Sequence, residues 1–194
     1  MARADEILSF WFGQLQDSEQ HYDEQRRLWF ASDPAIDQDI KDRFFTDYQQ
    51  AADNKLAHWQ NTPRTALALI LLYDQFPRNM FRGDPRAFAT DQLARAVTFQ
   101  VLNTTGDTQL QTIERMFIYM PLMHSEDLDH QRQSVELFQH LARVQPYLQG
   151  VVSYAVRHRE IIERFGRFPH RNVVLGRPST PEELDFLSQP GSPF

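Results

Sequence analysis

The stretch that most constrains the fold is ALALILLY, residues 66 to 73, which holds eight apolar residues without a break. It is far too short to span a membrane, because a membrane helix takes about 20 apolar residues. A helix that is apolar on every side is buried by its neighbours. The chain is therefore expected to pack several helices around this one. The run leads straight into the polar segment DQFPRN, residues 74 to 79, and this junction is the main question that the sequence raises.

Helical spacing continues along the rest of the chain, and no stretch alternates in the way that a strand does. Asp33-Pro34 and Thr62-Pro63 are start signals, Gly166 predicts a helix end, and Thr180 to Glu183 predicts a capping box. The predicted fold class is all-α, with eight to nine helices in antiparallel pairs. The expected helices cover residues 5–14, 23–31, 33–59, 63–75, 91–102, 107–121, 125–145 and 146–165 and a short stretch after 180, with long loops at 77–90 and 167–179.

Composition limits the class of protein. With 194 residues, the chain is expected to form one domain over residues 1–187, followed by a loose tail at 188–194. The formal net charge of -6 argues against nucleic-acid binding. Because there is no cysteine and the first residues do not form a secretion signal, we expect a cytoplasmic protein without thiol chemistry. Residues 157–177 hold six arginines against two glutamates, which predicts either internal ion pairs or a small anion site.

Three polar residues lie on the apolar stripes of three different helices. They are Asp74, Gln131 and His158. An ionised carboxylate cannot be buried alone, so each of these groups must face something polar. Two interpretations stay open: three separate structural hydrogen bonds, or one shared polar pocket.

A second group of candidates follows the helix that ends near Pro121, in MHSEDLDHQ, residues 123 to 131. Ser125 is expected to cap the next helix, and the acidic residues Glu126 and Asp127 suit its positive end. His124 has no such structural explanation and could serve as a general acid or base. The spacing matches no metal motif, so neither a metal nor a cofactor is predicted.

A third group lies around the second long loop, where Arg171 and Asn172 could hold a carboxylate or a phosphate. Arg78 and Asn79 could do the same after the apolar helix. In that interpretation, Pro77 ends the helix and lets these two side chains turn back over Asp74.

These stretches resemble the uncharacterised bacterial family catalogued as domain of unknown function 924. The matching segments, which cover nearly the whole chain, are ILSFWFG, WFxxDPxIDxxI with Phe44, LILLYDQFPRNMFRGDPRAFATD, YMPLMHSED with Gln131, and HRxIIxRFGRFPHRNxxLGRxSTPEExxFL. The resemblance implies an all-helical fold similar to tetratricopeptide-type helix pairs. It implies no established activity.

Three hypotheses follow from the residues. The first is a pocket for a small anionic molecule, with His158, His124 and Asp74 as candidates for acid–base catalysis. Its ligand-binding candidates are Arg78, Asn79, Glu126, Asp127, Gln131, Arg171 and Asn172. The second is a peptide-binding module without catalysis. The third is a buried polar network that only fixes the packing of the helices.

Overall fold

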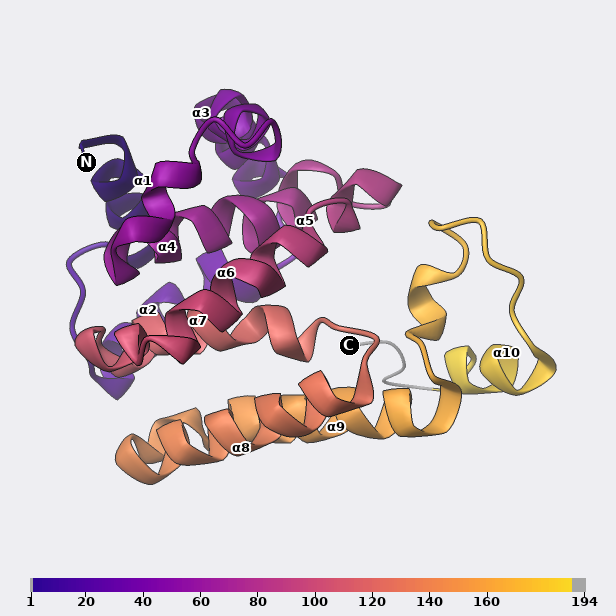
Figure 1. Ribbon diagram of the computed structural model, residues 1–194. Coiled ribbons are helices and arrows are strands. Elements are labelled where there is room, and N and C mark those ends of the chain that lie inside the picture. Colours follow the sequence, from indigo (N-terminus) through magenta and orange to yellow (C-terminus); the bar gives the residue numbers. More distant parts are fainter. Residues whose placement is uncertain (1, 190–194) are drawn as a thin grey trace.

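The structure is a computed structural model that describes residues 2–189. Within that range every element of regular secondary structure is a helix, and loops and turns connect the helices (Figure 1). The all-α prediction is confirmed. The α-helices are α1 (Ala2–Phe12), α2 (Glu19–Phe30), α3 (Pro34–Ala52), α4 (Pro63–Ile70), α5 (Phe76–Met80), α6 (Asp91–Asn103), α7 (Thr112–Met123), α8 (Leu128–Val144), α9 (Gln149–Phe165) and α10 (Pro181–Leu187). Short turns join them: η1 (Ala57–Asn61), η2 (Leu71–Gln75), η3 (Pro85–Phe88), η4 (Gly106–Gln109), η5 (Pro146–Leu148) and η6 (Pro169–Arg171).

The apolar run occupies the centre of the molecule, as its composition predicts. Every residue from Ala66 to Gln75 is buried, and α4 contacts α1, α6 and α7. Burying a leucine or isoleucine side chain contributes about 1.5–3 kcal/mol, so this segment is a major part of the stabilising core. Within the part of the chain that the structure describes, none of the helices is both long and apolar enough to cross a membrane.

Several helix ends lie where local signals predict them. The Asp33 side chain accepts a hydrogen bond from the Ala35 amide, and Thr62 does the same for Thr65. The capping box of α10 forms between Thr180 and Glu183. Gly166 ends α9 with a positive φ of 67°, which suits a residue without a Cβ.

Other boundaries differ from the prediction. The second helix begins at Glu19, earlier than the predicted residue 23, because Ser18 accepts from the His21 amide and caps it. The third helix ends at Ala52. Trp59, which its spacing predicts on the same helix, lies in η1 instead. Its helical spacing from the apolar residues of α3 arises by chance, because a turn separates the two elements.

The sixth predicted helix starts later and ends later than predicted. Residue 107 lies in η4, and α7 begins at Thr112, where Gln111 and Glu114 form a capping box. The predicted stop at Pro121 is also wrong, because α7 continues through this proline to Met123.

The C-terminal helices lie beside one another. Helix α8 contacts both α7 and α9, and Figure 1 shows α8 and α9 side by side along one edge, with α10 far from α1. A second apolar cluster of Ile161, Ile162 and Phe168 holds this end together. The single-domain boundary at 187 and the tetratricopeptide likeness stay predictions. Most of the predicted tail, residues 190–194, lies outside the described residues.

Candidate functional site

Asp74 lies in a π-helical turn within a continuing helix, and not at a helix end. The predicted stop at Pro77 and the loop from 77 are corrected here: α4 passes through η2, a π-helical turn, into α5. Proline has no N–H, so the Tyr73 carbonyl loses the donor that an α-helix would give it. The Thr90 hydroxyl replaces that donor at 2.6 Å. The helix therefore survives its proline, and Asp74 and Gln75 are both buried.

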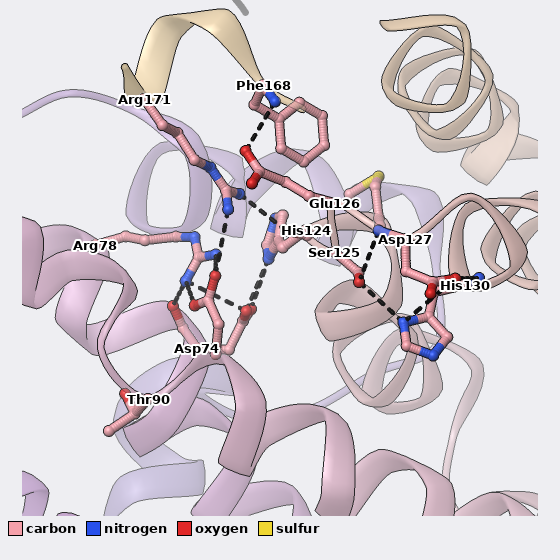
Figure 2. A network of polar contacts seen from close by, with 12 residues as sticks. Asp74, Arg78, Thr90, His124, Ser125, Glu126, Asp127, His130, Phe168 and Arg171 are labelled. Atoms are coloured by element: carbon pink, nitrogen blue, oxygen red, sulfur yellow. Dashed lines mark hydrogen bonds and ion pairs between the residues drawn. The ribbon is translucent and has the colours of Figure 1, made fainter. Parts of the chain in front are cut away.

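Asp74 and His124 form a hydrogen-bonded pair, drawn in Figure 2. His124 Nδ1 lies 2.8 Å from Oδ1 and 3.0 Å from Oδ2 of Asp74, which is completely buried. Gln75 donates to the same carboxylate, and Arg78 Nη1 lies 3.3 Å from it. Burial alone would raise the pKa of Asp74, but Arg78 and His124 outweigh it and hold that pKa well below its ordinary value. Asp74 is therefore ionised.

His124 ends α7 and opens onto a cavity, with 14% of its side chain exposed. Burial lowers its pKa, and the nearby Arg78 adds to this effect against the opposing influence of Asp74. The imidazole is therefore neutral at neutral pH. Because Nδ1 faces an ionised carboxylate, the proton lies on Nδ1, and Nε2 carries a lone pair. Among residues 2–189, no hydrogen bond is made to Nε2.

Two arginines share one carboxylate behind this pair. Arg78 makes a two-pronged contact to Asp91 at 3.0 and 3.1 Å. Arg171 lies 3.5 Å from Asp91 and donates to the His124 carbonyl at 3.0 Å. Burial, followed by repulsion from Arg78, lowers the pKa of Arg171 to about 10. Arg171 therefore ties the C-terminal turn η6 to the end of α7 (Figure 2).

Aromatic rings hold Arg171 in place. Its guanidinium lies 4.6 Å from the ring centres of both Phe88 and Phe168. A cation stacked on aromatic faces in a buried place is stabilised there by about 1–2 kcal/mol per contact. Arg171 is thus a fixed, buried group rather than a mobile surface group.

The cavity has a volume of about 1020 Å³ and lies between α2, the η2–α5 segment, α7 and α9. Its polar lining consists of Asp23, Arg26, Arg27, Gln75, Arg78, Asn79, Arg82, His124 and His158. Its apolar and aromatic lining consists of Tyr22, Trp29, Phe30, Ala31, Met120, Met123, Val151 and Tyr154. Two segments that are far apart in sequence, α2 and α5, thus both contribute side chains to it.

His158 of α9 also lines the cavity. Its ring centre is 6.3 Å from that of His124, and its Nδ1 lies 2.8 Å from the Tyr154 carbonyl. The contact to a carbonyl requires a proton on Nδ1. Burial, followed by the proximity of His124, lowers the pKa of His158 to about 3. Two neutral histidines therefore line the same cavity.

The charges around the cavity nearly cancel. Four guanidinium groups line it, and each already has a carboxylate partner. The partners are Asp23, Asp33, Asp37, Asp74 and Asp91, of which only Asp23 lines the cavity. The four lining arginines carry four positive charges, and their partners carry five negative charges. Arg171, which is also paired with Asp91, brings the net charge of the whole group to zero. The wall itself is basic, while most of the compensating carboxylates lie behind it.

Two predicted ligand-binding residues lie in a different network. Glu126 accepts two hydrogen bonds from Arg177 at 2.7 and 2.9 Å and one from the Phe168 amide. Asn172 donates to Glu183, which also receives two hydrogen bonds from Arg167. Neither Glu126 nor Asn172 lines the cavity. Their contacts attach the loop after α9 to the rest of the protein.

Gln131 and Asp127 also have structural contacts. The Gln131 side-chain amide donates to the carbonyls of Met123 and Ser125, both at 2.6 Å, at the end of α7. Asp127, rather than the predicted Ser125, caps α8 by accepting from the amides of residues 129 and 130. Ser125 instead lies 2.9 Å from His130 Nδ1. The contacts of Gln131 and Asp127 therefore account for the positions of these two side chains without a ligand.

The structure thus brings together Asp74, Arg78, His124, His158 and Arg171, with Asn79 at the cavity wall. Sequence reasoning missed Asp91, Thr90 and the arginines of α2. A signal existed for Thr90, because a proline inside a helical pattern leaves a carbonyl that needs an outside donor. Within residues 2–189, no three His, Asp or Glu side chains are grouped as metal ligands would be.

The fold and the site define an all-helical protein with a buried aspartate–histidine pair at the wall of an arginine-lined cavity. The chain belongs to DUF924, a family of bacterial proteins of unknown function, which it matches over residues 7–191. It is also similar to the solved structure of a protein of unknown function from Agrobacterium tumefaciens. That similarity has a TM-score of 0.83 and 38% sequence identity, and it covers 96% of this chain and 97% of the other. No curated protein matches the chain.

Proposed function

We propose that the cavity binds a small anionic molecule and that His124, oriented by Asp74, exchanges a proton with it. The observation that carries this proposal is the Asp74–His124 contact of 2.8 Å at the wall of a cavity lined by four arginines. A neutral imidazole whose Nδ1–H is held by a buried carboxylate is a common arrangement for a general base.

The chemistry follows from the two nitrogens of the ring. Nε2 can accept a proton from a bound molecule or from a water beside it, while Nδ1–H stays bonded to Asp74. The imidazolium that forms is stabilised by the ionised carboxylate. Arg78 is too basic to take part as a base, and its place at the wall suits it to orient the negative group of the ligand. The residues support a proton-transfer step, such as hydrolysis or elimination, and do not select between these reactions.

Binding can be tested by thermal unfolding in the presence of acetate, benzoate, inorganic phosphate and citrate. We expect at least one of these anions to stabilise the protein, because a ligand at 100 times its Kd adds about 2.7 kcal/mol. His124→Gln and Arg82→Gln should weaken that effect, since both side chains line the cavity. The matched controls are His140→Gln and Arg132→Gln, which change exposed residues of α8. If none of the anions binds, or if all four variants behave alike, the proposal is wrong.

The proton-transfer part has a separate test. Nitrogen-15 spectra of the histidine side chains should show His124 as the neutral Nδ1–H form at pH 7. Asp74→Asn should disturb that form, because an amide can present its NH₂ group to the ring instead. A wild-type His124 that is protonated on Nε2 alone would rule out its role as a base toward the cavity.

A second candidate is a peptide-binding module without catalysis, and the exposed aromatic rim favours it. Phe30 and Tyr154 are 49% and 55% exposed, and they line the cavity from two different helices. Such rings could grip the last side chain of a peptide while the arginines bind its terminal carboxylate. Binding of acetylated tripeptides with a free C-terminus, but not of the same peptides with an amidated C-terminus, would favour this candidate.

A further inference from the structure

Much of the cavity lining is apolar or aromatic. Its largest members are Trp29 and Phe30 of α2, Met120 and Met123 of α7, and Val151 and Tyr154 of α9. The polar atom of Trp29 is already used, because its indole N–H donates to the Trp11 carbonyl at 2.8 Å. The part of that ring that lines the cavity is therefore carbon surface. An unbranched methionine side chain adapts its shape to different apolar partners.

Two side chains of this apolar and aromatic lining are exposed to solvent. Phe30 and Tyr154 belong to the few large apolar or aromatic side chains that remain exposed in the described part of the chain. Both line this one cavity, although they come from helices more than 100 residues apart. Exposed apolar side chains that gather at one concave place are typical of a binding site. A small, fully polar anion would leave this surface in water.

The charge balance limits the other end of the ligand. The arginines that line the cavity keep donors to spare, because a guanidinium has five N–H groups. Each is nevertheless already paired with a carboxylate, and the whole group sums to zero. One added negative charge can be held by these donors. Each further negative charge is added to a group that is already neutral and is repelled by Asp23 at the wall, so one charge is favoured over two.

The size of the cavity agrees with an extended ligand. Small-molecule sites have volumes of roughly 300–1,000 Å³, and this cavity is at the upper end of that range at about 1020 Å³. A two-carbon acid would fill only a small part of it. The remaining space lies against the methionine and aromatic side chains.

We infer that the natural ligand is an amphipathic monocarboxylate, with one carboxylate and a long aliphatic or aromatic body. This inference rests on the proposed function and narrows its ligand class. The carboxylate lies on the side of Arg78, Arg82 and His124. The body lies along Trp29 and the methionines of α7 and ends between Phe30 and Tyr154.

The inference can be tested by calorimetric titration with acetate, butanoate, hexanoate and octanoate at constant pH and ionic strength. Affinity should rise by about threefold to fourfold with each methylene, as expected when methylenes leave water for an apolar surface. Octanedioate should bind at least tenfold more weakly than octanoate. Its second carboxylate must either lie against the apolar lining residues, where it loses its hydration, or be repelled by Asp23.

Variants connect the chain-length dependence to the cavity. Phe30→Ser and Tyr154→Ser change exposed side chains, so both proteins should fold, and both should flatten the rise in affinity from hexanoate to octanoate. Val144→Ser is the matched control, because Val144 is 62% exposed and does not line the cavity. It should leave the series unchanged.

The outcomes separate this inference from the proposed function. If acetate and octanoate bind equally well, or if only phosphate or citrate binds, the amphipathic class is overturned and the proposed anion site stands. If octanoate binds equally to the wild type, Phe30→Ser, Tyr154→Ser, His124→Gln and Arg82→Gln, binding lies elsewhere and both ideas fail. If no carboxylate and no phosphate binds, both fail as well.

Discussion

The molecule contains two clusters in which arginines pair with carboxylates, and the two differ in their position relative to the cavity. The open cluster consists of Asp74, Arg78, Asp91, His124 and Arg171. The C-terminal clamp consists of Glu126, Arg167, Asn172, Arg177 and Glu183. The open cluster has members at the cavity wall, and the clamp has none.

Hydrogen bonding shows the difference more clearly. In the clamp, each arginine has a carboxylate to itself: Arg177 binds Glu126 and Arg167 binds Glu183, each with two hydrogen bonds. In the open cluster, two guanidinium groups share Asp91, and Nε of the buried Arg171 has no partner among the described residues. A network whose hydrogen bonds are saturated fixes structure, whereas the open cluster reaches the cavity through Arg78 and His124 and is suited to bind a ligand there.

The largest expected effect is that of Asp74→Ala. It should lower the free energy of unfolding by about 3–5 kcal/mol, because it removes a fully buried carboxylate and leaves the half-buried Arg78 without one of its two carboxylates. Urea denaturation measures this loss. A variant with near wild-type stability would show that the open cluster is not an obligatory part of the core.

Asp74→Asn is the matched substitution, because it keeps the shape and removes the charge. We expect a folded protein that is less destabilised than Asp74→Ala and in which His124 loses its Nδ1–H form. If Asp74→Asn instead leaves the His124 spectrum unchanged, the cluster serves packing alone, and its difference from the clamp is only one of position.

Two histidines outside the open cluster, His158 and His170, should also make the protein sensitive to mild acid. Burial lowers the pKa of His158 to about 3 and that of His170 to about 4, both below the ordinary value of about 6.5. The unfolded chain therefore binds protons first as pH falls, so stability is full above about pH 6.5 and is lost below it. The two histidines together should cost about 3 kcal/mol between pH 6.5 and 5.

Urea unfolding at half-unit pH steps tests this expectation. His158→Gln should reduce the slope of stability against pH by about a third to a half, because His124 and His170, whose pKa values are also lowered, keep their contributions. His140→Gln, which changes an exposed histidine of α8, should leave the slope unchanged. The clamp carboxylates do not interfere in this window, because the pKa of Glu126 and that of Glu183 are both lowered and their effects appear at lower pH. A flat profile from pH 6.5 to 5 would contradict the burial of neutral histidines.

Features that depend on neighbouring residues could be predicted from the sequence. The helix starts at Asp33 and Thr62 and the capping box at Thr180 each involve residues no more than three positions apart. The passage of the helix through Pro77 could not be predicted in that way. It depends on the Thr90 hydroxyl, which is 17 residues away from the carbonyl that it satisfies.

The same limit explains the candidate site. Periodicity predicted the inward positions of Asp74 and His158, because helical spacing sets which face a residue occupies. It could not tell Arg171, in the open cluster, from Asn172, in the clamp. These two adjacent residues belong to different clusters because their partners differ. Arg171 contacts Asp91, 80 residues away, and Asn172 donates to Glu183, 11 residues away.

The smallest expected effect is that of Glu126→Gln, and it is the sharpest test of the clamp as a purely structural element. Glu126 is partly exposed, with 28% of its side chain accessible, so water compensates part of the lost pairing with Arg177. We expect a loss of about 1 kcal/mol in the free energy of unfolding. Anion binding and the His124 spectrum should not change, because Glu126 does not line the cavity. If Glu126→Gln instead abolishes anion binding while the protein stays folded, the clamp controls the cavity through Phe168 and Arg171, and the two clusters act as one.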